Sequence, residues 1–114
     1  MDCEIILPVE NIDVCRYFYR DTVGLGEPEI DSNLLVSFRL NEHTSLVLEK
    51  CELPHLLSHA SSACRFMLDA DSLPGIRERM RQNGTPLADG FTRSGAKVSR
   101  GIDPDGNCFM VREP

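Results

Sequence analysis

The spacing of hydrophobic residues changes several times along this chain, and the same order of changes occurs twice. Alternating or continuous apolar runs predict strands, and apolar residues at helical spacing predict one helix in each half. In the first half, strands are predicted at 3–9, 34–40 and 44–50, with a short one within 27–33. In the second half, they are predicted at 64–70, 96–102 and 107–112. Repetition within a chain is a signal of fold, and the predicted fold class is α+β with two paired β-α-β-β-β modules.

Residues that favour helix ends mark the two predicted helices. Asn11 is the predicted N-cap of the first, and Gly24 follows its last turn. In the second half we predict Ser72 as the N-cap, with Pro74 in the first turn and Gly84 after the last.

The chain of 114 residues is expected to form a single domain. The modules are placed at about 1–52 and 63–114, joined by residues 53–62, in which a short helix is predicted. Residues 85–95 are predicted to be a loose connection.

Composition narrows the classes of protein to consider. The net charge is −6 and the basic residues do not cluster, which argues against nucleic acid as a partner. No apolar run is long enough for a membrane span, and the N-terminus lacks the pattern of a secretory signal. Five cysteines without a CxxC pair indicate reduced thiols. A cytoplasmic protein with no membrane partner is therefore expected.

Two short motifs indicate a particular fold family. Phe18-Tyr19 stands shortly before Val23-Gly24-Leu25, and the turn at 103–107 reads Asp-Pro-Asp-Gly-Asn. With the duplicated strand order, these motifs resemble the vicinal oxygen chelate superfamily, which includes glyoxalase I, bleomycin-resistance proteins and extradiol dioxygenases. The resemblance implies a curled mixed β-sheet with a concave cleft and helices on the outer face. It also implies a homodimer, formed by compact subunits or by exchange of modules.

Members of that superfamily commonly bind a metal with about four ligands. Aligned by the resemblance, these positions fall at Glu4, Val47, Arg65 and Met110. Only Glu4 suits a hard cation, and the arginine would repel one. No metal and no other cofactor is therefore expected. A pair of histidines in the joint, His55 and His59, is interpreted as solvated.

Strand periodicity assigns the two faces of the predicted sheet. One face is almost entirely apolar and should pack on the helices. The other face would line the cleft and carries the predicted ligand-binding residues: Glu4, Arg39, Glu49, Arg65, Met67, Met110 and Arg112.

Two interpretations of these cleft residues stay open. In the first, an arginine holds a carboxylate or phosphate, a glutamate takes an amine, and the methionines form an adaptable floor. In the second, Glu4 and Glu49 form ion pairs with Arg39, Arg65 and Arg112. On the second helix, Arg77, Arg79 and Arg81 alternate with Glu78 and are predicted to be solvated.

The sequence favours a glyoxalase/bleomycin-resistance-like protein that binds a small polar or charged organic molecule without a metal. No catalytic residue is assigned. The first alternative is a metal-dependent glyoxalase-like lyase, isomerase or dioxygenase that uses Glu4 and Glu49. The second alternative is a non-catalytic dimerisation module. These alternatives differ in whether the cleft holds a ligand, a metal or the protein's own side chains.

Overall fold

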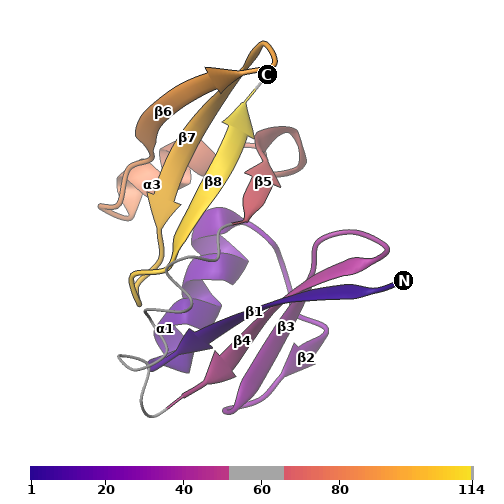
Figure 1. Ribbon diagram of the computed structural model, residues 1–114. Helices are drawn as coiled ribbons and strands as arrows, with labels where there is room; N and C mark the ends of the chain where they lie inside the picture. Colours follow the sequence, from indigo (N-terminus) through magenta and orange to yellow (C-terminus); the bar gives the residue numbers. More distant parts are fainter. Residues whose placement is uncertain (52–65, 114) are drawn as a thin grey trace.

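The computed structural model describes residues 1–51 and 66–113 and shows an α+β fold with two β-sheets (Figure 1). The first half contains β1 (Cys3–Val9), α1 (Ile12–Tyr17), a π-helical turn (Phe18–Val23), β2 (Ile30–Asp31), β3 (Leu35–Arg39) and β4 (Thr44–Lys50). The second half contains β5 (Met67–Asp69), a 3-10 turn (Ala70–Ser72), α3 (Ile76–Gln82), β6 (Ala88–Arg93), β7 (Ala96–Ile102) and β8 (Cys108–Glu113).

The two halves repeat one strand order. The strand orders in the sheets are β1-β4-β3-β2 and β5-β8-β7-β6. The pairs β1–β4 and β5–β8 are parallel, and the other pairs are antiparallel. The two β-α-β-β-β modules predicted from the sequence are confirmed. The described strands form two sheets and not one, and the expected curling stays a prediction. None of the described helices is long and apolar enough to cross a membrane.

Several predicted boundaries are confirmed to the residue. The strands at 3–9, 44–50 and 96–102 match, and the Asn11 side chain accepts a hydrogen bond from the backbone of Val14 at 3.2 Å. Gly24 ends the π-helical turn with a φ of 95°, which favours glycine. The helix predicted in the joint and the histidines there lie outside the described residues.

The prediction for the start of the second helix is wrong. Ser72 ends the 3-10 turn, and α3 begins at Ile76 after Gly75, which has a φ of 83°. Pro74 and Gly75 occupy the middle of a turn closed by a hydrogen bond from the Ile76 amide to the Leu73 carbonyl at 3.1 Å. Proline followed by a residue with positive φ is the pattern of a type II turn, which delays the helix.

The loose connection predicted at 85–95 is also wrong, because it contains the strand β6. Every side chain of β6 is exposed, so the strand carries no alternation of buried and exposed residues. It pairs antiparallel with β7 and has an irregularity between Asp89 and Phe91. Backbone pairing places this strand, and a hydrophobic pattern could not have revealed it.

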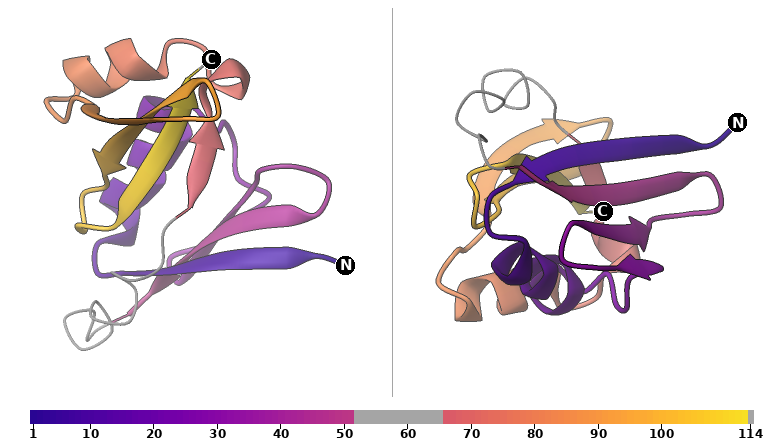
Figure 2. Two further views of the ribbon diagram at one scale, coloured as in Figure 1. Left: turned by 45° about the horizontal axis from the view of Figure 1, so that its top comes forward. Right: turned by 90° about the horizontal axis from the view of Figure 1, so that it is seen from below.

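The core lies on the apolar face of both sheets, against the helices (Figures 1 and 2). The face predicted to be apolar supplies Leu7 and Val9, and the matching positions on the other strands. The buried residues from these strands are Leu7, Val9, Val36, Phe38, Leu46, Leu48, Phe66, Leu68, Phe109 and Val111. Burial of each such side chain stabilises the fold by roughly 1.5–3 kcal/mol relative to exposure. One cluster joins the two modules.

The two motifs that suggested the fold meet in a buried hydrogen bond. The Tyr19 hydroxyl donates to Asp103 Oδ2 at 2.7 Å, and both residues are almost completely buried. The same carboxylate accepts hydrogen bonds from the Asp105 amide, the Asn107 amide and the Asn107 side chain. Burial raises the pKa of the Tyr19 hydroxyl well above its ordinary value, and the charge of Asp103 adds to that shift. Burial also raises the pKa of Asp103, while its donors oppose the shift.

Arg79 connects the modules through the main chain. Its guanidinium donates to the carbonyls of Thr22 and Val23, both at 2.9 Å, and so caps the helical segment of the first module. Arg77 forms an ion pair with Glu113. The prediction that the arginines of this helix are solvated is therefore wrong for these two, because their long side chains reach neighbouring elements. It holds for Arg81, which is exposed and pairs with Glu78.

We expect Tyr19→Phe to lower the free energy of unfolding by about 1–3 kcal/mol, because the buried Asp103 carboxylate loses a donor. Urea unfolding followed by circular dichroism measures this. Tyr17→Phe is the matched control, since that tyrosine is 56% exposed. Equal stability of the two variants would contradict the expectation.

Candidate functional site

The open face of the second sheet, which is the face turned away from the core, carries paired side chains from neighbouring strands. Met67 on β5 lies opposite Met110 on β8, and Asp69 lies opposite Arg112. On the other side of β8, β7 places Arg100 opposite Met110 and Val98 opposite Arg112. Since side chains two residues apart share a face, these residues form one surface. Met67 and Met110 are partly buried, while Arg112 is exposed.

An ion pair fixes one arginine at this surface. Arg112 Nη2 donates to Asp69 Oδ2 at 3.1 Å, and the Asp71 amide donates to Asp69 Oδ1 at 3.3 Å. The hydrogen bond from Arg112, followed by that from the Asp71 amide, lowers the pKa of Asp69. The pair is solvent-exposed, so its role is to orient the guanidinium and it adds little stability.

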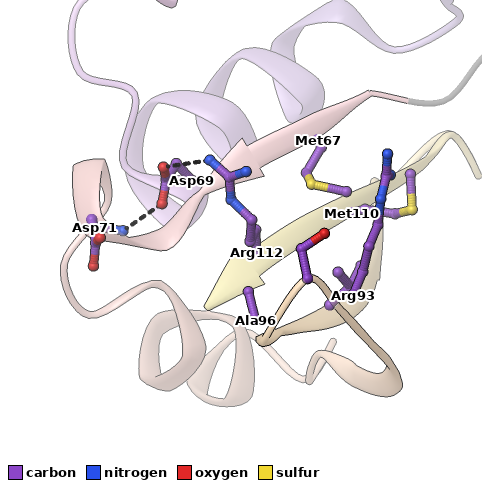
Figure 3. Close-up of a pocket in the computed structure, with 9 residues that line it drawn as sticks. Met67, Asp69, Asp71, Arg93, Ala96, Met110 and Arg112 are labelled. Atoms are coloured by element: carbon purple, nitrogen blue, oxygen red, sulfur yellow. Dashed lines mark hydrogen bonds and ion pairs between the residues drawn. The ribbon is translucent and has the colours of Figure 1, made fainter. Parts of the chain in front are cut away.

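A cavity of about 590 Å³ lies over this surface (Figure 3). Its walls come from β5, the 3-10 turn, β8 and the hairpin of β6 and β7. The lining residues are Met67, Asp69, Asp71, Arg93, Ser94, Ala96, Val98, Met110 and Arg112. The cavity thus combines a thioether and aliphatic floor with two arginines and two aspartates.

The structure brings together three of the seven residues predicted from the sequence. Met67, Met110 and Arg112 line this cavity. Arg39 lines a second cavity of about 610 Å³, between the two modules, which Met67 also lines. Glu4 and Glu49 lie on the open face of the first sheet, opposite Ser45 and Pro8. Arg65 lies outside the described residues.

The second interpretation of the cleft predicted ion pairs between its glutamates and its arginines. The described arginines of this set form ion pairs with other acids. Arg39 pairs with Glu29 at 2.8 Å, and Arg112 pairs with Asp69. Within residues 1–51 and 66–113, neither Glu4 nor Glu49 forms an ion pair. The proposed pairing of these glutamates with Arg39 and Arg112 is therefore wrong, because nearer acids take both arginines.

In the described part of the chain, the aligned metal-ligand positions lie on two separate sheets. Val47 is buried beside Ile6 in the first sheet, and Met110 lies in the second. Within residues 1–51 and 66–113, no group of three His, Cys, Asp or Glu side chains could share a metal ion. The expectation of a metal-free site stays a prediction.

The ligand-binding residues predicted from the sequence do not include Asp69, Asp71 or Arg93, although strand periodicity places Asp69 on the cleft face. Asp69 had a usable signal, because it follows Met67 by two positions and so shares its face. Arg93 had none, because β6 carries no recognisable strand pattern. Asp71 is brought to the rim by a 3-10 turn where a helix cap was expected.

Comparisons with known proteins identify the fold. No family model matches the sequence, and neither does any curated protein. Solved structures match across nearly the whole chain. A glyoxalase/bleomycin resistance protein from Catenulispora acidiphila DSM 44928 matches with a TM-score of 0.74 and 18% identity, covering 100% of this chain and 98% of that one. The chain has the glyoxalase/bleomycin-resistance fold.

Other proteins with this fold differ in function. An antibiotic-binding protein from Streptomyces sp. CB03234 has a TM-score of 0.70 and 21% identity, over 100% of this chain and 95% of that one. A lactoylglutathione lyase from Agrobacterium tumefaciens has the same TM-score and identity, 0.70 and 21%, over 99% and 92% of the two chains. The fold therefore accommodates both binding and catalysis, and the function of this chain has to be argued from its own residues.

We expect Arg112→Gln to raise the pKa of Asp69 toward its ordinary value of 3.8, because the largest stabilising contact of the carboxylate is lost. Carbon NMR of the side-chain carboxyl through an acid titration measures the shift. Arg93→Gln removes an arginine from the same cavity without breaking this ion pair and serves as the control. An Asp69 pKa unchanged by Arg112→Gln would contradict the assignment.

Proposed function

We propose that this protein binds a small polar or charged organic molecule on the open face of the second sheet and needs no metal to do so. The observation that supports this most directly is the methionine floor beside a fixed arginine. Met67 and Met110 are flexible and polarisable, so they adapt to varied apolar surfaces. The bond from Arg112 to Asp69 uses one guanidinium nitrogen, which leaves further N–H groups for an anionic or polar group of the ligand.

The size and chemistry of the cavity support binding. Its volume of about 590 Å³ is within the usual range for small-molecule sites, roughly 300–1,000 Å³. Five of the nine lining residues are polar or charged, which is more than is usual for such sites and suits a polar or charged ligand. The antibiotic-binding protein of the same fold gives a precedent for binding, at an identity too low to transfer its ligand.

Methyl NMR of the protein labelled at its four methionines tests the proposal. A panel of carboxylates, amines and drug-sized aromatic molecules is titrated into the protein. We expect a binding molecule to shift the signals of Met67 and Met110 and to leave Met80 unchanged, because Met80 is fully buried in the core. Leu substitutions at 67 and 110 assign the signals.

Two outcomes would contradict this proposal. If no member of the panel moves the two cavity methionines, the face is not a general ligand site. If the purified protein carries stoichiometric metal that is lost in Glu4→Gln, the metal-dependent alternative replaces the metal-free one. Elemental analysis of the same preparation decides the second point.

We also propose that the protein forms a homodimer through the open face of the first sheet. That face exposes two large apolar side chains, Ile6 at 49% and Ile30 at 54%. β1 pairs with β4, and its other edge has no strand partner within residues 1–51 and 66–113. Exposed apolar surface beside a strand edge is a common feature of protein interfaces.

Ile6→Lys is expected to shift the protein from dimer to monomer, because a charge would be buried at the interface. Light scattering coupled to size-exclusion chromatography measures the mass. Val14→Lys is the control, since Val14 is similarly exposed, at 45%, but lies on α1. A monomeric wild-type protein would overturn the proposal.

A further inference from the structure

Of the four charged residues that line the cavity of the second sheet, two form an ion pair with each other and two form none among the described residues. Asp69 and Arg112 bind each other, and Asp69 also accepts from the Asp71 amide. Arg93 and the Asp71 carboxylate form no ion pair with any other residue of 1–51 or 66–113. Both side chains are exposed to the cavity. Among the described residues, the lining therefore offers a ligand one cation and one anion that form no ion pair.

The free charges come from opposite walls. Asp71 belongs to the 3-10 turn after β5, and Arg93 is the last residue of β6. Figure 3 shows them at opposite sides of the cavity, with Arg112 between them and the two methionines on the side of Arg93. The charges of Asp69 and Arg112 cancel each other. The field along the cavity is therefore set by Asp71 at one end and Arg93 at the other.

We infer that the ligand is a zwitterion, with an amine and a carboxylate separated by an apolar body. This rests on the proposed function of the cavity. The protonated amine binds Asp71, the carboxylate binds Arg93, and the part of the apolar body next to the carboxylate lies over Met67 and Met110. A simple anion would leave Asp71 without a partner and a simple cation would leave Arg93 without one, whereas a ligand with both charges can bind at both ends.

The test compares three probes of equal length by methionine methyl NMR: ε-aminocaproate, hexanoate and hexylamine. Each exposed ion pair is worth roughly a factor of two to five in affinity. The amino acid makes one ion pair more than either singly charged probe, so it is expected to bind about two- to fivefold more tightly. Shorter and longer ω-amino acids then give the chain length that best spans the two charges.

Two variants separate the ends of the ligand. Asp71→Asn is expected to remove the advantage of the amino acid over hexanoate, and Arg93→Gln its advantage over hexylamine. Arg81→Gln is the control for the arginine, because Arg81 is exposed on α3 and does not line the cavity. Asp21→Asn is the control for the aspartate, because Asp21 lies on the helical segment of the first module.

The outcomes distinguish this inference from the proposed function. If hexanoate binds as tightly as every amino acid of the series, or if Asp71→Asn leaves the preference unchanged, the ligand is not a zwitterion. If other molecules shift Met67 and Met110 but no ω-amino acid does, the cavity remains a binding site and the zwitterion inference is wrong. If nothing shifts them, both are overturned.

Discussion

The hydrogen bond between Tyr19 and Asp103 is the contact on which the arrangement of the two modules depends. A buried carboxylate is costly unless donors surround it, and here the tyrosine of one module and the turn of the other supply them together. Among the described residues, no buried side-chain polar atom lacks a partner. The second aspartate of the turn, Asp105, accepts a hydrogen bond from the Glu10 amide just after β1. Both acids of the turn therefore bind the first module.

This constraint also positions the candidate site. The turn at 103–107 leads directly into β8, and the register of β8 decides which of its side chains face the cavity. Phe109 and Val111 enter the core, so Met110 and Arg112 must face the other way. A slip of one residue would bury the arginine and expose the aromatic ring. The pairing register of β8 thus determines both which residues enter the apolar core and which form the methionine floor.

The fold could be predicted from this sequence further than the site could. Strands such as 44–50 and 96–102 carry apolar periodicity, and the two motifs that suggested the fold contribute Tyr19 and Asp103 to one buried hydrogen bond. The ion pairs could not be predicted, because several acids are within reach of each long side chain. Which of them forms the pair depends on distances in the folded structure. Arg39 forms its ion pair with Glu29, and Arg93 lines the cavity from a strand that has no buried residue. Periodicity identifies faces, whereas partners depend on the folded coordinates.

The contact that Arg79 makes with the first module has a consequence for tolerance to substitution. The guanidinium binds the backbone carbonyl oxygens of Thr22 and Val23. Since every amino acid has this oxygen, the contact with Arg79 does not depend on which side chains stand at these positions. Gly24 is different, since its left-handed φ strains any other residue and a Cβ there would displace the Arg79 guanidinium. Burial of both side chains therefore limits which residues fit at 22 and 23, whereas Gly24 and Arg79 are required by the contact between the modules itself.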